Sequence, residues 1–277
     1  MVRQIDAELR PRRSIYAMDR TLFGDFEEFD TMDPEIRSRI VLDPADLPAG
    51  ADVVAGHLGL ATITARQREI RLATVLREPR ARLLSHWLYW RSYDDEVLAR
   101  YGGWQQAMAL SRLDFPDFLA HAQIACIADN LLVRMLLSPH PLIPLAGFID
   151  PQHDSALIAA ARSALARFHH VGIAENPSLS ERFAAWARHA YGRSPWAALR
   201  AAIPDRQPSR PNEARASKLR GPPILQQLAA ADDKLAACTR LDRMLWEQAA
   251  QITLQQADIV PIGDRVFADT LQRYTAL

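Results

Sequence analysis

The feature that most constrains the fold of this chain is a run at 71–91, which changes from a strand-like to a helix-like pattern at a single proline. Its first six residues, RLATVL, are mostly apolar and include the β-branched Thr74 and Val75, which is typical of a buried strand. Pro79 suits the first turn of a helix, where its missing N–H has no partner to lose. The run therefore predicts a strand, a tight turn and a helix that begins at Pro79.

The helical part of this run has an apolar face and a polar face. At 3.6 residues per turn, Leu83, Trp87 and Trp90 share one face. The other face carries the polar residues Arg82, Ser85, His86 and Tyr89. The start of such a helix points free N–H groups and its positive dipole end at the carboxyl end of the strand, where anions bind in open α/β sheets. Arg77 stands in the turn, and Ser85 lies two turns into the helix.

The same residues resemble L-R-[DE]-P-x-x-R-x-x-S-x-[YW], a phosphate-binding pattern of PAPS-dependent sulfotransferases, especially the membrane-type carbohydrate branch and its bacterial relatives. Here the pattern runs from Leu76 to Trp87, with Glu78 where the family usually has Asp. The resemblance implies that Arg77 and Ser85 bind the 3′-phosphate of the donor PAPS and of its product PAP. A guanidinium makes bidentate, charge-assisted bonds to phosphate, and a hydroxyl adds a donor. An ordinary strand–helix joint with a solvated arginine is the alternative.

A second segment, DVVAGH at 52–57, has the pattern of another short strand that ends in Gly56-His57. In the same branch of the family, a strand ending in Gly-His precedes the phosphate-binding strand by a similar interval, and its histidine is a proposed general base. The resemblance therefore implies that His57 takes the proton of the acceptor hydroxyl. Histidine suits this role because its unperturbed pKa is about 6.5. The alternative is a histidine that is hydrogen-bonded in a loop.

Strands and helices alternate along the rest of the chain. Further strands are expected at 14–18 and 169–175, and helices at 34–37, 104–110, 115–122, 127–137, 153–167, 178–191 and 232–256. Alternation of strand, helix and strand indicates a parallel sheet with right-handed crossovers. Together with the resemblance, it predicts one α/β domain over 1–277. The implied fold has three layers, like a P-loop nucleotide kinase, with a short parallel sheet and many helices.

Four further segments resemble parts of the family. The strand at 169–175, with Phe168 before it, resembles a F-x-x-V-G-x-x-E strand, and LDRMLWEQA at 241–249 resembles the closing x-D-x-x-L-Y-E-x-A of the family. Asp129-Asn130 followed by Arg134 resembles a helix whose polar residues approach the donor or the acceptor, and a helix face with a salt bridge is the alternative. The Pro- and Arg-rich segment 203–223 resembles a loop that closes over the nucleotide as a lid, with a plain surface loop as the alternative. No single residue of that segment is assigned a role.

The resemblance fails at the N-terminal side. Sulfotransferases of this kind open with a strand and a Pro-Lys-Thr-Gly-Gly-Thr-Ser-type loop, whose N–H groups cradle the 5′-phosphosulfate. Nothing before Gly56 has this form, and no lysine precedes Lys218. We therefore expect the chain to be a piece of a longer enzyme that lacks this N-terminal strand and loop. The missing strand would be the central strand of the sheet. The missing part would be about 30–50 residues, the size of a β-loop-α unit. Loss of the loop from a protein that binds nucleotide without transferring sulfate is the alternative.

The composition limits the kinds of partner that the chain is expected to bind. The 33 basic and 33 acidic residues cancel, so no bulk attraction to nucleic acid or an anionic membrane is expected. No run approaches the ~18 apolar residues of a membrane helix, and the charged N-terminus has no secretory signal, so we expect no membrane segment and a cytoplasmic location. Cys126 and Cys238 lack metal-type spacing, and His140 and His153 lack partners at helical spacing. Buried free thiols and no metal are therefore expected.

These features together predict a sulfotransferase that moves a sulfuryl group from PAPS to a hydroxyl of a carbohydrate or other small molecule and releases PAP. A catalytically inactive nucleotide-binding or interaction protein on a degraded sulfotransferase fold is the alternative. A P-loop kinase is a third reading, but the Walker-type GxxxxGK[ST] run that it needs is absent. The sequence carries no readable signal for the identity of the acceptor or for the oligomeric state.

Overall fold

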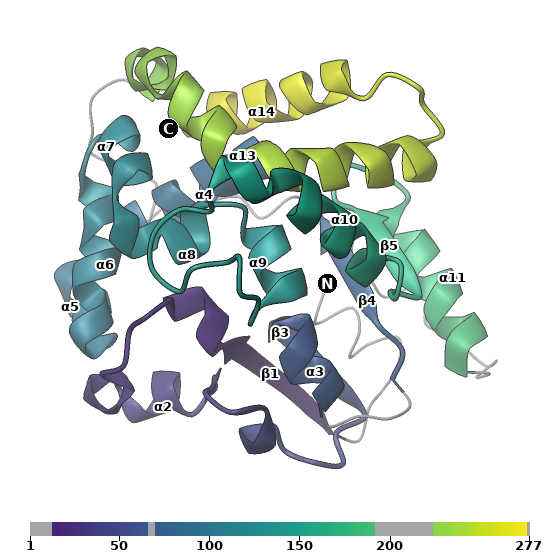
Figure 1. The fold of residues 1–277 in the computed structure, drawn as a ribbon, viewed down its shortest axis with the longest axis horizontal. Coiled ribbons are helices and arrows are strands. Elements are labelled where there is room, and N and C mark those ends of the chain that lie inside the picture. Colours follow the sequence, from purple (N-terminus) through teal and green to yellow (C-terminus); the bar gives the residue numbers. More distant parts are fainter. Residues whose placement is uncertain (1–12, 66–69, 192–223, 276–277) are drawn as a thin grey trace.

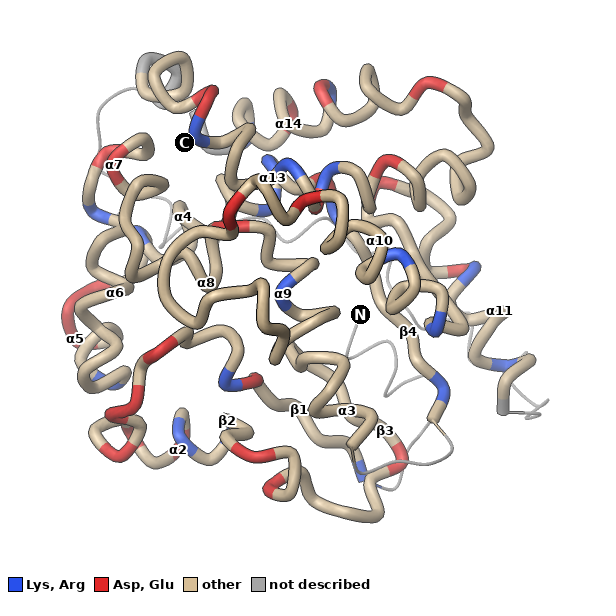
Figure 2. The backbone as a smooth tube through the Cα atoms, in the orientation of Figure 1, with Lys and Arg blue, Asp and Glu red and all other residues tan. Residues whose placement is uncertain are grey.

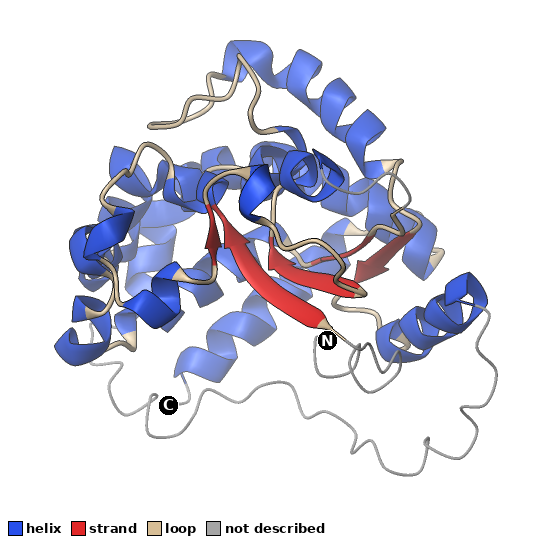
Figure 3. Cartoon of the chain, turned by 90° about the horizontal axis from the view of Figure 1, so that it is seen from below, coloured by secondary structure: helices blue, strands red, loops and turns tan. Residues whose placement is uncertain are grey.

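The computed structural model describes residues 13–65, 70–191 and 224–275, in which many helices surround a few short strands (Figure 1). The strands are β1 (Ser14–Asp19), β2 (Ile40–Val41), β3 (Val53–His57), β4 (Ala73–Leu76) and β5 (His170–Ile173). The helices are α2 (Pro34–Arg37), α3 (Leu60–Ala65), α4 (Pro79–Arg91), α5 (Asp95–Ala99), α6 (Gln105–Ala109), α7 (Phe115–Ala120), α8 (Ala125–Ala128), α9 (Leu131–Leu137), α10 (Asp154–Leu165), α11 (Leu179–Tyr191), α13 (Ile224–Leu254) and α14 (Val260–Thr275). Figure 3 shows the strands crossing the middle of the molecule, between helices.

The strands form two parallel sheets. β1 lies between β2 and β3, so that Met18 stands beside Ile40 on one side and His57 on the other. β4 pairs with β5, and Leu76 stands beside Ile173. The expected α/β class, with many helices and short parallel strands, is confirmed. The single sheet expected from the sequence does not form among the described strands, because β3 and β4 are not paired.

The strand predicted near the N-terminus is confirmed as β1, and it is the middle strand of its sheet. We expected the central strand of the sheet to be missing, but β1 takes the middle position in its sheet. A 3-10 helix, Arg20–Phe23, follows the strand and is capped by the buried Asp19. The Asp19 carboxylate accepts hydrogen bonds from the N–H groups of Thr21 (2.7 Å) and Gly59 (3.1 Å) and from the hydroxyl of Thr62. No strand in the described ranges leads into a glycine-rich loop of the phosphate-cradling kind.

The predicted helices form, with differences at particular residues. The helix expected at 127–137 is split into α8 and α9, because Asn130 adopts a left-handed conformation with φ of 48°. The amide oxygen of Asn130 accepts the N–H of Leu241 at 2.8 Å, which ties this break to α13. α13 begins before the predicted 232 and spans Ile224–Leu254. No helix was predicted at α14, which packs against α4 and α13.

The apolar face of α4 is buried as predicted. Leu83, Trp87 and Trp90 lie in the largest core cluster, where they meet side chains of α6 and α7. Full burial of each such side chain contributes about 1.5–3 kcal/mol. On the opposite face, Tyr89 is 46% exposed. Packing of one face against the core thus leaves the other face of α4 for the candidate site.

The distribution of charged residues and the burial of the two cysteines agree with the expectations from the sequence. Basic and acidic residues are interspersed along the described chain (Figure 2). Cys126 and Cys238 are buried free thiols, as predicted, and burial raises the pKa of each to about 12, which disfavours a reactive thiolate at neutral pH. None of the helices within the described residues is long and apolar enough to span a membrane.

Candidate functional site

Hydrogen bonds fix the turn between β4 and α4, both to the start of α4 and to the segment after β5. Glu78 caps α4, since its Oε2 accepts the N–H of Ala81 at 2.7 Å, while its Oε1 accepts Nε of Arg80 at 2.7 Å. The N–H of Glu78 donates in turn to Oε1 of Glu175 at 2.9 Å. These bonds fix the turn that carries Arg77 against the segment that follows β5. Glu in place of the Asp usual in sulfotransferases is therefore compatible with a capped helix start.

Glu175 links this turn to α13. Its second carboxylate oxygen, Oε2, accepts the indole N–H of Trp246 at 3.2 Å. Burial is the largest influence on the Glu175 carboxyl and raises its pKa, against the hydrogen bonds and the charge of Arg77, which lower it. One side chain thus satisfies two N–H groups that belong to different parts of the fold.

Glu175→Ala is expected to lower the free energy of unfolding by about 2–4 kcal/mol, because it leaves two largely buried N–H groups without acceptors. Glu175→Gln should cost about half as much, since its amide oxygen can still serve one of the two donors. Urea denaturation at pH 7 would measure both. The matched control is Glu181→Ala on the exposed side of α11, for which a change within about 0.5 kcal/mol is expected. An equal effect of Glu175→Ala and the control would contradict the role of Glu175.

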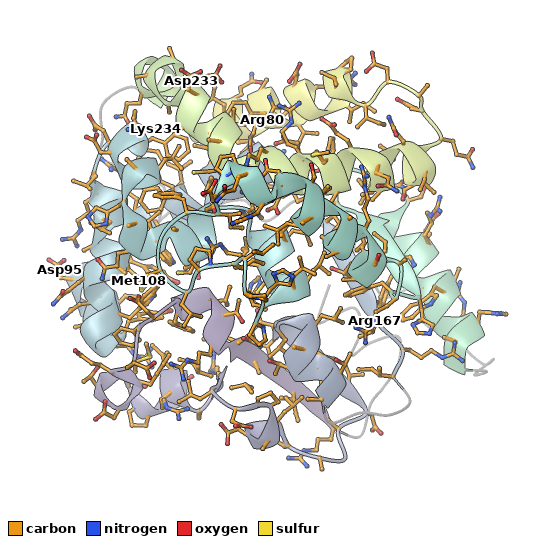
Figure 4. The ribbon with its side chains drawn as sticks, in the orientation of Figure 1. Arg80, Asp95, Met108, Arg167, Asp233 and Lys234 are labelled. Atoms are coloured by element: carbon orange, nitrogen blue, oxygen red, sulfur yellow. The ribbon has the colours of Figure 1, made fainter. Side chains whose placement is uncertain are left out.

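Arg77 reaches from the turn toward α14. Its Nη2 donates to Oγ1 of the buried Thr270 at 3.2 Å. Arg80, labelled in Figure 4, contacts the same helix through Asp264 (2.9 Å between Nη2 and Oδ1) and lies 5.2 Å from the ring centroid of Phe267. α14 therefore borders the candidate site. Sequence reasoning missed it because no local pattern marks a residue 193 positions away as a neighbour of Arg77.

His57 is the last residue of β3 and is exposed. Gly56 before it has φ of 137°, and a Cβ there would lie 1.9 Å from the carbonyl oxygen of Ala17 in β1. Only glycine allows β3 to approach β1 so closely, which gives the predicted Gly-His pair a structural reason. Although the residue as a whole is exposed, partial removal of the imidazole from water, and after it the charge of Arg82, lowers the pKa of His57. The imidazole is therefore mostly neutral at pH 7, the form that accepts a proton.

Electrostatic interactions connect His57 with the polar face of α4. Burial first, and then the charges of Arg82 and His57, lower the pKa of His86 to about 3. The charge of Arg77 in turn acts on Arg82. These interactions link His57 to Arg82 and His86, and Arg77 to Arg82. The partly buried Ser85 lies in α4 next to His86 in the sequence. Neither Arg82 nor His86 was assigned a role from the sequence.

Asp129 and Arg134 form a buried ion pair, in agreement with the salt-bridge alternative for this segment. They are 1% and 2% exposed, and Nη2 of Arg134 lies 2.9 Å from Oδ2 of Asp129. Arg134 also donates to the carbonyl oxygens of Pro144 (2.7 Å) and Gly147 (2.8 Å). These contacts favour the salt-bridge alternative over an approach to the donor or the acceptor, because protein groups occupy both side chains. They hold the 138–150 connection in place.

The predicted lid at 203–223 lies outside the described residues. Within the residues that the structure does describe, no group of three His, Cys, Asp or Glu side chains could hold a metal ion.

Comparisons with known proteins give no relative. No family model matches the chain, and no curated protein and no solved structure matches it either. The resemblance to sulfotransferases therefore rests on sequence motifs alone, chiefly those around the β4–α4 turn and at Gly56-His57.

Proposed function

We propose that this chain is a PAPS-dependent sulfotransferase, which transfers a sulfuryl group to a hydroxyl of a carbohydrate or other small molecule. Its fold would be the three-layer, P-loop-kinase-like fold of that family. The observation that carries the proposal is the fixed β4–α4 turn, where Arg77 stands at the start of a capped helix. Electrostatic interactions of His57 with Arg82 and His86, which share the polar face of α4 with Ser85, also support the proposal.

In this proposal Arg77 and Ser85 bind the 3′-phosphate of the donor. The guanidinium supplies charge-assisted hydrogen bonds, and the N-terminus of α4 adds the positive end of its dipole. Because Glu78 and Glu175 hold the turn, Arg77 starts from a fixed position and little reorganisation is needed when the phosphate binds. Fixing one end of the donor orients its reacting end, which is a main source of rate in group transfer.

His57 is the general base in the proposed reaction. Its neutral imidazole takes the proton of the acceptor hydroxyl, and the acceptor oxygen forms a bond to sulfur. The bond between sulfur and the phosphate oxygen of the donor breaks in line, so that PAP leaves and the acceptor carries the sulfate. The lowered pKa of His57 favours the neutral form that this step requires.

Calorimetric titration of the chain with PAP tests the donor site, with AMP as the control that lacks the 3′-phosphate. PAP is expected to bind at least about tenfold more tightly than AMP, since charge-assisted hydrogen bonds contribute about 1.5–3 kcal/mol. Equal affinity for the two nucleotides, or no binding of PAP, would remove the proposed function.

The second candidate is a nucleotide-binding protein that transfers no sulfate. The 3-10 helix after β1 supports it, because no phosphate-cradling loop occurs within the described residues and no lysine precedes Lys218. Incubation with PAPS labelled with ³⁵S and a panel of mono- and oligosaccharides separates the two candidates. Labelled acceptor would exclude the second candidate, whereas tight binding of PAP without any transfer would favour it.

A further inference from the structure

Two buried nitrogen atoms on the polar face of α4 lack a hydrogen-bond partner. They are Nη2 of Arg82 and Nε2 of His86, which lie one helical turn apart. Only three other buried side-chain polar atoms within the described residues share this condition. Buried polar groups are nearly always satisfied by protein, water or a ligand, so a pair of adjacent exceptions indicates a site for something that accepts hydrogen bonds.

Protein groups satisfy Arg82 poorly. Its Nη1 reaches the carbonyl oxygen of Ile127 only at 3.5 Å, and its Nη2 lies 3.9 Å from Oδ2 of Asp242. The Asp242 carboxylate instead accepts the N–H groups of Leu132 (3.0 Å) and Val133 (3.1 Å) at the start of α9. The ion pair of Arg82 with Asp242 is therefore long, and Nη2 of Arg82 keeps its charge without a hydrogen bond to an anion.

His86 supplies a second, neutral group. Its ring packs edge-on against Trp90, with 4.5 Å between ring centroids, so the orientation of the imidazole is restricted. Burial lowers its pKa to about 3, so the ring is uncharged at pH 7 and unsuited to act as the base. A neutral imidazole can place its hydrogen on Nε2 and donate it to an oxyanion.

The electrostatic interactions of this pair with His57 are the basis for naming the oxyanion. A base must touch the hydroxyl that it deprotonates, and the oxygen of that hydroxyl must lie about 3–3.5 Å from the atom that it attacks. Charged groups that act on His57 can therefore also act on the sulfuryl group of a bound donor. Arg82 acts on His57, and His57 acts on His86.

We propose that Nη2 of Arg82 and Nε2 of His86 bind the sulfuryl oxygens of the donor, apart from the 3′-phosphate contacts of Arg77 and Ser85. This inference rests on the proposed function. It assigns to an arginine the positive charge at the sulfuryl group, in a chain whose two lysines are Lys218 and Lys234. Lys234, labelled in Figure 4, donates to the carbonyl oxygen of Pro116 at 3.2 Å and thus lies beside α7.

The test compares the affinities for PAPS and for PAP, which differ by the sulfuryl group, in calorimetric titrations without acceptor. Arg82→Gln is expected to weaken PAPS binding by about tenfold or more, and His86→Phe by about fivefold. Both variants should change PAP affinity by less than about threefold. His86→Phe keeps an aromatic ring against Trp90 and removes the unpartnered nitrogen, so it should fold even if Arg82→Gln does not.

Arg91→Gln is the matched control, because Arg91 lies on the opposite face of α4 and donates to the carbonyl oxygens of Ser111 and Leu113. It should leave the ratio of PAPS to PAP affinity unchanged. The inference fails if His86→Phe and Arg82→Gln weaken PAP and PAPS equally, or if neither variant alters PAPS binding, which would mean that water fills the site. If the unaltered chain binds no PAP, the proposed function fails first and this inference with it.

Discussion

Replacing His57 with Ala is expected to lower the rate of sulfuryl transfer by about 10²–10⁴-fold, the usual contribution of a positioned general base. The affinity for PAP should stay within about twofold, because the imidazole acts on the acceptor and not on the 3′-phosphate. Steady-state transfer from PAPS, together with calorimetry of PAP, would separate the two effects. A loss of PAP affinity equal to the loss of rate would instead indicate damage to the donor site.

The pH dependence of the reaction gives a second check on His57. The pKa of His57 is lowered from 6.5, so the imidazole is mostly neutral at pH 7 and becomes protonated only at a pH below 6.5. We therefore expect kcat/KM to be level near pH 7 and to fall along an acid limb that lies below pH 6.5. His57→Ala should remove this limb. His189→Ala, which alters an exposed histidine of α11, should keep it. An unchanged acid limb in His57→Ala would exclude His57 as the base.

Replacing Arg77 with Ala is expected to weaken PAP binding by about 10–100-fold, since hydrogen bonds to charged groups contribute about 1.5–3 kcal/mol. AMP affinity should change much less, because AMP has no 3′-phosphate for Arg77 to hold. Arg77→Lys should recover only part of the loss, since a lysine keeps the charge but not the bidentate geometry. Calorimetry of the variants with both nucleotides would measure these differences.

Arg80→Ala provides the control for Arg77. Arg80 lies in the first turn of α4, but its guanidinium is held by Glu78 and Asp264. Arg80→Ala should lower the free energy of unfolding but leave the affinity for PAP nearly unchanged.

Equal losses of PAP and AMP affinity in Arg77→Ala would instead indicate general damage to the nucleotide site. Unchanged PAP affinity would remove the central assignment of the proposed function.

The sequence by itself determined the local elements around the candidate site. The β-branched run, Pro79 and the 3.6-residue period of Leu83 and Trp87 are properties of neighbouring residues, and β4 and α4 formed where these signals placed them. Burial of Cys126 and Cys238 followed in the same way from their apolar surroundings. Such elements are predictable because the interactions that specify their boundaries span only a few residues.

Only the tertiary structure decided which distant groups meet. α14 borders Arg77, and Glu175 holds the N–H of Glu78 from 97 positions away. The left-handed Asn130 divides a helix that periodicity alone predicts as continuous, because α13 supplies partners for its side chain. The unpartnered nitrogens of Arg82 and His86 likewise depend on what packs around α4. A local pattern shows that a residue is polar and on one face, but only packing determines whether protein satisfies it or leaves it for a ligand.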